Sequence, residues 1–302
     1  MSARPSPSTG RPYGVRRTCA AWGIPRSSFY SKTCPSSCSS PDDPTPERRK
    51  TGPKTDISDT ELLSLIREDL ATSSFTGEGH RKVWARLKYV QGIPVARKRV
   101  LRIMRENNLL SPHRVPQKPP YEHTGRIVTS EPNVMWGTDG ARVFTAGDGW
   151  GWIFACVEHW NSECIGHHVT KRGDRFAALE PVAQGLMTEF ASVAAGAARG
   201  LSLRMDHGSQ YLSDYFQKQI KAWGIAPSFA FLEQPQTNGV AERFFRTLKE
   251  QVIYGRVYTD LEEVRQAVSA FVELYNNQWL IEKNGYLSPR DARKAYYESE
   301  AA

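Results

Sequence analysis

"NVMWGTDGARVFTAGDGWGWIFACVEHWNSECIGHHVTK", residues 133–171, contains three successive runs that are rich in β-branched and aromatic residues. Such residues are enriched in β-strands. A Gly-Asp-Gly turn at 147–149 and an Asn-Ser turn at 161–162 separate the runs, so we expect a strand on each side of each turn. The expected strands cover residues 133–146, 149–160 and 162–171.

Downstream of these strands, helical and strand-like segments alternate along the chain. Three strands followed by this alternation predict a mixed sheet with helices on its faces, which is an α/β domain. The later segments are a helix over 175–195, a strand over 201–206, a helix over 213–224, a strand over 226–231, a helix that begins after the Asn-Gly turn at 238–239, and a helix over 261–278.

Upstream of the strands, three short helical patterns occupy residues 57–112. The first begins at Ser58 and has Glu61 three residues later, which is a capping-box signature. A basic last helix, residues 95–110, favours a helix-turn-helix unit that places this helix in the major groove of DNA. The alternative is a solvated basic face in an ordinary helical bundle. The candidate DNA-binding residues of this helix are Arg97, Lys98, Arg102 and Arg105.

The net charge of +8 is unevenly distributed along the chain. Residues 1–126 contain 23 Lys and Arg against 11 Asp and Glu, whereas residues 127–302 contain 17 against 21. A basic front half suggests that this half binds a polyanion. Because no amphipathic helix with an apolar anchor face stands out, we expect nucleic acid and no membrane partner.

The cysteine pattern and the N-terminus indicate which kind of cellular compartment the protein occupies. Five cysteines form no C-x-x-C pair, and a reducing compartment is the simplest interpretation. No apolar run is long enough to cross a bilayer, and the basic N-terminus lacks the apolar stretch of a secretory signal.

Two aspartates stand at unusual positions in the predicted sheet. Asp139 lies within the first expected strand, and Asp206 ends the strand over 201–206. A carboxylate at the end of a buried strand is costly unless it is paired or bound to a metal. Each also has an ordinary interpretation, since Asp206 could cap a turn and Asp139 could lie at a sheet edge. Ligands of open α/β sheets gather at the carboxyl ends of strands, which favours a functional Asp206.

A third acid, Glu242, lies near the start of the helix in "QPQTNGVAERFFRTLKEQ", residues 234–251. Helical spacing aligns Glu242 with Arg246 and Lys249 in one row. An i,i+4 surface pair of Glu242 with Arg246 would stabilise the helix by only about 0.2–0.5 kcal/mol. The neighbouring apolar stripe, expected to pack on the sheet, is Ala241, Phe245, Leu248 and Val252.

Three ordered motifs carry a resemblance to a known family: "WGTD" at 136–139, "MDHGSQY" at 205–211 and "NGVAERFFRTLK" at 238–249. They resemble the acidic triad of DDE transposases and retroviral-type integrases, and 35 residues separate Asp206 from Glu242, as is typical there. More closely, residues 60–296 resemble the OrfB-type transposase of the insertion-sequence-three family. The resemblance implies a ribonuclease H-like core preceded by an all-α helix-turn-helix domain.

The same resemblance implies a catalytic site. Asp139, Asp206 and Glu242 would hold two Mg²⁺ ions, with Mn²⁺ as a substitute, and would serve DNA cleavage and strand transfer. Arg246 and Lys249 would hold phosphates of the DNA ends. Other expected DNA-binding residues are Asn238, which would also shape the turn into the helix, and His207. His207 as a general base is a second interpretation.

The implied partners are the terminal inverted repeats of the element and the target DNA, bound by a homo-oligomer in the bacterial cytoplasm at the nucleoid. The N-terminus lacks the first-frame helix-turn-helix and coiled-coil part of the family, so a first-frame partner or a frameshift fusion is expected. Trp279 and Ile281 stand where the family often has Arg and His, and no zinc module is present. The expected domains are 1–33, a helix-turn-helix fragment; 34–56, a linker; 57–112, the DNA-binding domain; 113–128, a linker; and 129–298, the catalytic core.

Two other functions compete with this prediction. A regulator derived from a transposase would bind DNA without cutting it, although binding alone gives no reason to retain three carboxylates. A ribonuclease H-like nuclease would cut DNA without joining it, although the helix-turn-helix segment and the tail favour transposition.

Overall fold

The computed structural model describes residues 2–33, 57–113, 127–230 and 238–301. It forms two compact units, Met1–Lys54 and Thr55–Ala302. The first unit contains the helices α1 (Gly14–Ala21) and α2 (Arg26–Thr33), as the helix–break–helix pattern predicted. The expected linker 34–56 and most of the linker 113–128 lie outside the described residues. The domain boundaries that we placed within the second unit stay predictions.

The second unit begins with three helices around a small apolar core. They are α3 (Asp59–Thr72), α4 (His80–Ala85) with its π-helical continuation η1 (Arg86–Val90), and α5 (Arg97–Glu106). The Ser58 hydroxyl accepts a hydrogen bond from the Glu61 amide at 3.1 Å, which confirms the predicted helix start. On α5, the side chains of Val100, Ile103 and Met104 are buried in this core.

A five-stranded mixed sheet follows, as predicted. The strands are β1 (Met135–Thr145), β2 (Gly149–Glu158), β3 (Cys164–Thr170), β4 (Ser202–Met205) and β5 (Ala226–Phe229). Their order in the sheet is β3-β2-β1-β4-β5, with β1, β2 and β3 antiparallel and with β4 and β5 parallel to β1. This arrangement is that of a ribonuclease H-like domain.

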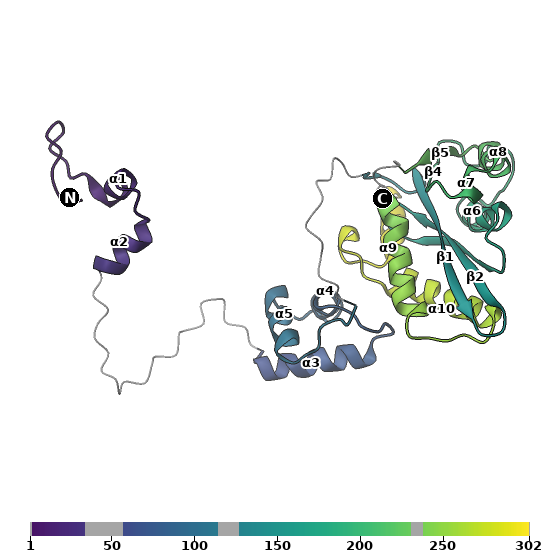
Figure 1. Cartoon of the computed structure of the whole chain (residues 1–302), viewed down its shortest axis with the longest axis horizontal. Helices are drawn as coiled ribbons and strands as arrows, with labels where there is room; N and C mark the ends of the chain where they lie inside the picture. The colour runs from purple at the N-terminus through teal and green to yellow at the C-terminus, as the bar shows by residue number, and fades with distance from the viewer. Residues whose placement is uncertain (1, 34–56, 114–126, 231–237, 302) are drawn as a thin grey trace. The chain divides into compact units, whose positions relative to one another are not determined.

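Helices cover both faces of the sheet (Figure 1). The helices on the faces are α6 (Arg175–Phe190), α7 (Ser209–Leu212), α8 (Asp214–Ala222), α9 (Gly239–Leu248) with its π-helical continuation η3 (Lys249–Ile253), and α10 (Leu261–Gln278). The 3₁₀ turn η4 (Glu282–Asn284) and α11 (Pro289–Glu300) follow α10 in the chain. The predicted helix over 175–195 ends early, because Ala191 adopts a left-handed conformation with φ of 52°. Among these described helices, none is long and apolar enough to span a bilayer.

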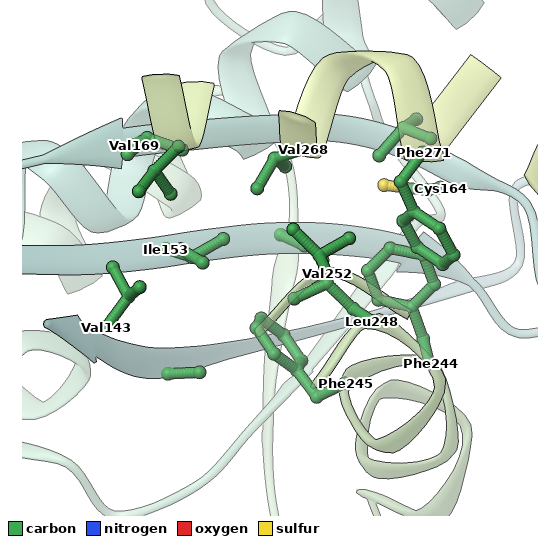
Figure 2. Packing of buried hydrophobic residues seen from close by; sticks show 14 of the residues in the cluster. Val143, Ile153, Cys164, Val169, Phe244, Phe245, Leu248, Val252, Val268 and Phe271 are labelled. Carbon is green, nitrogen blue, oxygen red and sulfur yellow. The ribbon is translucent and has the colours of Figure 1, made fainter. Parts of the chain in front are cut away.

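Two apolar cores fix the helices on the sheet. Figure 2 shows the first, in which Phe244, Phe245 and Leu248 of α9 point toward strand residues such as Ile153. The predicted stripe of α9 and η3, from Ala241 to Val252, is buried in this core or beside it. The second core packs α6, α7 and α8 on the opposite face through residues such as Trp136 and Leu186. The sheet therefore holds α9, which carries Glu242, firmly against β1.

Trp279, one of the two departures from the family pattern, packs within this unit. Its ring lies 4.8 Å from the Phe75 ring and 6.0 Å from the Tyr275 ring, measured between centroids. The Lys82 Nζ atom lies 3.7 Å from the Trp279 ring centroid and donates a hydrogen bond to the Leu280 carbonyl. Trp279 thus joins the segment after α10 to α4 and to the segment that precedes α4.

Lys82→Met is expected to change how stability depends on pH. Loss of water around Nζ lowers the pKa of Lys82 to about 7, whereas an unfolded lysine titrates near about 10.4. Between these pH values the unfolded chain binds more protons, so this group adds stability as pH rises from about 7 toward 10. Urea unfolding should show the free energy of unfolding of the unsubstituted chain rising relative to Lys82→Met over this range. Parallel pH profiles for the two chains would contradict this assignment.

Candidate active site

Strand register brings the two aspartates to the same level of the sheet. In the parallel pair of β1 and β4, Gly137 lies opposite Arg204, and each of these residues precedes an aspartate by two positions. Asp139 lies within β1, and Asp206 directly follows the last residue of β4. Because β4 is short, Asp206 leaves the sheet at its carboxyl end, beside the middle of the longer β1.

The start of α9 is attached to β1 at the residue before Asp139. The Asn238 side-chain amide donates a hydrogen bond to the Thr138 carbonyl at 3.1 Å. A Cβ atom at Gly137 would lie 3.0 Å from Asn238 Oδ1, so Gly137 allows the close approach of the helix start. Side chains alternate across a strand, so Asp139 shares the face of Gly137, toward α9. Glu242 lies in the first turn of α9, one turn after Asn238.

The electrostatics show that the three carboxylates share one region. The pKa of Asp139 is raised to about 6, chiefly by burial and in smaller part by the negative charges of Asp206 and Glu242. The Gly140 amide, at 2.7 Å from Asp139 Oδ1, and the charge of Lys249 act in the opposite direction. Burial also raises the pKa of Glu242, and the Arg246 charge lowers it. The predicted row of Glu242, Arg246 and Lys249 therefore lies beside the aspartates.

The three carboxylates lie in the same region but do not converge closely enough to form a metal-binding group by themselves. In the part of the chain that the structure describes, no group of three or more His, Cys, Asp or Glu side chains is placed to hold a metal ion. Within the same part, none of the three acids forms an ion pair shorter than 4.0 Å with a Lys, Arg or His side chain. Among the described residues, the negative charges of these three acids are therefore not balanced by an ion pair.

His207 and Asn238 differ in exposure. His207 is exposed beside Asp206, and its ring centroid lies 5.4 Å from that of Phe229. Asn238, which we expected to bind DNA, is only 3% exposed, and its amide is used by the Thr138 carbonyl. A buried side chain offers DNA no surface in this arrangement, so Asn238 is better placed to position α9 than to contact DNA.

The four candidate DNA contacts of α5 form a separate, exposed group. Arg102 is paired with Asp59 at 2.7 Å and with Glu106 at 3.1 Å, and Arg97 lies 3.8 Å from Glu282. Lys98 and Arg105 have no carboxylate within 4.0 Å among the described residues. Lys98 and Arg105 are therefore more available to a phosphate than Arg102 is.

Sequence reasoning gave no role to Tyr211, whose side chain lies near both aspartates. Its side chain is fully buried in the short helix α7. Burial raises its pKa, and the charges of Asp139 and Asp206 raise it further, so the phenol lies close to both acids. A four-residue helix shows no periodicity, and the only available signal was the position of Tyr211 five residues after Asp206.

Comparisons with known proteins agree with the motifs. Residues 58–117 match the family described as "HTH-like domain", and residues 223–289 match the family described as "Integrase core domain". The chain is 29% identical over 241 residues to Transposase InsD for insertion element IS2A/D/F/H/I/K of Escherichia coli, covering 77% of this chain and 78% of that protein. The same identity and coverage relate it to Transposase InsD for insertion element IS2D of Escherichia coli strain K12.

Two solved structures show more distant similarity. The catalytic core domain of BIV integrase is 19% identical, covers 56% of this chain and 99% of its own length, and superposes with a TM-score of 0.41. A chain of the simian T-cell lymphotropic virus intasome is 15% identical, covers 76% of this chain and 74% of its own length, and superposes with a TM-score of 0.43. On the sequence motifs, the two domain matches and the InsD relatives, the chain carries an HTH-like domain followed by an integrase core domain and is similar to the transposases of insertion elements.

Proposed function

We propose that Asp139, Asp206 and Glu242 hold two Mg²⁺ ions, or Mn²⁺ as a substitute, and that strand cleavage and strand transfer take place there. The observation that supports this most is the meeting of three unpaired carboxylates, one from β1, one after β4 and one from α9, close enough to affect the charge of Asp139. Carboxylate oxygens are the protein ligands that Mg²⁺ prefers. When bound, the two ions would activate the attacking oxygen and stabilise the leaving oxygen.

The residues around the acids have separate roles in this proposal. Arg246 and Lys249 lie next to the carboxylates and bind the phosphates of the DNA end, since their charges already influence Glu242 and Asp139. The exposed His207 imidazole contacts the DNA backbone beside Asp206. The buried Tyr211 phenol lies near both aspartates, whose charges add to the effect of burial in raising its pKa. The homo-oligomer on DNA and the first-frame partner stay predictions.

A strand-transfer assay tests the reaction. The purified chain is incubated with a DNA end that carries a candidate terminal repeat, a target plasmid and Mg²⁺. We expect joined products that disappear on chelation of the metal and reappear with Mn²⁺. Binding without cutting would indicate the regulator instead, and cutting without joining would indicate the nuclease.

Asn238→Ala is expected to lower the rate of strand cleavage by about 10- to 100-fold, because a displacement of about 1 Å in a reacting group can cost this much. The variant loses the bond between the start of α9 and the Thr138 carbonyl, so Glu242 shifts relative to Asp139. Affinity for DNA should stay unchanged, which separates a positioning role from the DNA contact that we first expected. Asn284→Ala is the matched control, because it removes a 2.9 Å side-chain bond to the Asn161 carbonyl that involves neither β1 nor α9. Equal losses of DNA affinity and rate in Asn238→Ala would favour the DNA contact.

Arg105→Ala is expected to weaken DNA binding and to reduce its salt dependence. One lost phosphate contact reduces the slope of log K against log salt by about 0.9. Arg102→Ala should have a smaller effect, because Asp59 and Glu106 already neutralise Arg102. Titrations of the terminal repeat at several salt concentrations measure this, with the exposed Arg67 of α3 replaced by Ala as control. An unchanged salt slope in Arg105→Ala would indicate that the basic face of α5 is solvated and does not bind DNA.

A further inference from the structure

Aromatic side chains gather on one face at the end of the β1–β2 hairpin. Phe144 and Trp150 are paired across the two strands, are 54% and 53% exposed, and have ring centroids 5.4 Å apart. Arg142 lies two residues before Phe144 on the same face, with its guanidinium carbon 4.5 Å from the Trp150 ring centroid. Aromatic residues and arginine are enriched where a protein surface contacts a partner, and a contiguous group of them is more informative than a single exposed ring.

A second cluster of the same composition lies at the start of α6. Phe176 and Tyr215 are 48% and 47% exposed, and their ring centroids are 4.8 Å apart. The Arg175 guanidinium carbon lies 4.9 Å from the Phe176 ring centroid. Each cluster thus combines two exposed rings with one arginine that lies over a ring.

The loop between β3 and α6 joins the two clusters. A Cβ atom at Gly173 would lie 2.4 Å from the Trp152 ring, so the loop rests on a residue next to the first cluster. At the other end of the loop, Lys171 Nζ lies 3.8 Å from the Cβ position of Gly149, which adjoins Trp150. We call the resulting surface the hairpin face; it consists of Arg142, Phe144, Trp150, Arg175, Phe176 and Tyr215.

The arginines of the hairpin face are not engaged in ion pairs with described residues. Within the described ranges, Arg142, Lys171 and Arg175 have no carboxylate within 4.0 Å. The nearby Asp174 side chain caps α6 by accepting hydrogen bonds from the amides of Phe176 and Ala177. A solvated salt-bridge surface would pair its cations with acids, whereas here the arginines lie over aromatic rings.

We propose that the hairpin face binds DNA, with phosphates on its cations and unpaired bases stacked on its exposed rings. Cations interleaved with aromatic rings are the combination that single-stranded nucleic acid requires, because every base has a stacking face. An acidic polypeptide would use the cations but would not need four exposed rings. Arg142 lies three residues from Asp139 along β1, about 10 Å, and on the opposite face of the sheet. The hairpin face is therefore separate from the carboxylates, and the proposal does not depend on their role.

Fluorescence anisotropy of the full chain in EDTA tests this, since binding is then read without any cleavage. The probes are a blunt duplex and the same duplex with a single-stranded tail. Trp150→Ala combined with Phe176→Ala should lower the affinity for the tailed probe by about 10-fold or more, since stacking contributes about 1–3 kcal/mol per base, and should change blunt-duplex binding little. Arg142→Ala combined with Arg175→Ala should weaken both and reduce the salt slope by about 1.8.

The matched control lies on α11, where Lys294 and Tyr297 are an exposed cation and an exposed aromatic residue. Lys294→Ala combined with Tyr297→Ala should leave both affinities unchanged, and thermal unfolding should show that all variants are folded. Unchanged tailed-probe affinity and salt slope in the two hairpin-face variants would overturn the proposal. Retained DNA affinity together with lost binding to polyglutamate would also overturn it, in favour of an acidic protein partner. This test reads binding without cleavage, so its outcome does not depend on whether substitution of Asp139, Asp206 or Glu242 abolishes activity.

Discussion

Asp139→Asn, Asp206→Asn and Glu242→Gln are each expected to abolish strand cleavage and strand transfer while DNA binding persists. Each substitution keeps the size of the side chain and removes one negative charge from the proposed metal site. The expected loss is on the order of 10³-fold or more, at the upper end of what removal of one preorganised electrostatic group costs. Binding persists because α5, Arg246 and Lys249 are unchanged.

The measurement is the strand-transfer assay in Mg²⁺, together with anisotropy of the terminal repeat. A second readout is the thermal stabilisation of the chain by Mg²⁺ or Mn²⁺, which should decrease in all three variants because a ligand stabilises only a state that binds it. Glu250→Gln is the matched control, since Glu250 lies in η3, the continuation of the same helix as Glu242. Normal cutting and joining in any one of the three variants would remove that residue from the site.

Phe244→Ala is expected to lower the free energy of unfolding by about 3–5 kcal/mol, the usual cost of truncating a buried Phe. Phe244 is 1% exposed, and its ring centroid lies 5.1 Å from that of Tyr275. Its ring centroid also lies 6.0 Å from that of Phe271, and Figure 2 shows both phenylalanines in the core. The substitution leaves a cavity between α9 and α10. Because α9 also carries Glu242, strand transfer should fall even at temperatures where the variant is folded.

Denaturant unfolding of the full chain measures this loss. Tyr254→Ala is the control, since Tyr254 is an exposed aromatic residue just after η3 and should change stability by less than about 0.5 kcal/mol. A loss below about 1 kcal/mol in Phe244→Ala would mean that the core between α9 and α10 relaxes around the cavity.

Much of the fold could be predicted because its signals are local. Asn-Gly at 238–239 and the apolar stripe from Ala241 to Val252 locate a helix and its buried face without reference to any other segment. The strand runs and turns between 133 and 171 likewise locate β1, β2 and β3 within a few residues. Short or strained features are harder to predict from sequence, and the prediction missed both the four-residue helix α7 and the end of α6 at Ala191.

Contacts between distant segments left no local signal. At Gly166 of β3 only glycine fits, because a Cβ atom there would lie 2.0 Å from the Pro181 carbonyl oxygen of α6. Nothing near Gly166 in the sequence indicates this close approach of α6. The role of Asn238 likewise had no local signal, since an asparagine at this position suits a turn and a DNA contact equally well. Its hydrogen bond to the Thr138 carbonyl, 100 residues away in the chain, favours the first role.

The sequence by itself determined the residue types and spacing of this protein: three acids in order, a basic front half, and a helix with one apolar and one charged face. The family motifs follow from that information alone. Only the tertiary structure decided which groups meet, because strand register and helix packing bring together residues that are far apart in the chain. It placed Asp139 level with Asp206, attached α9 to β1 through Asn238, buried Tyr211 near the acids, and left the hairpin face exposed.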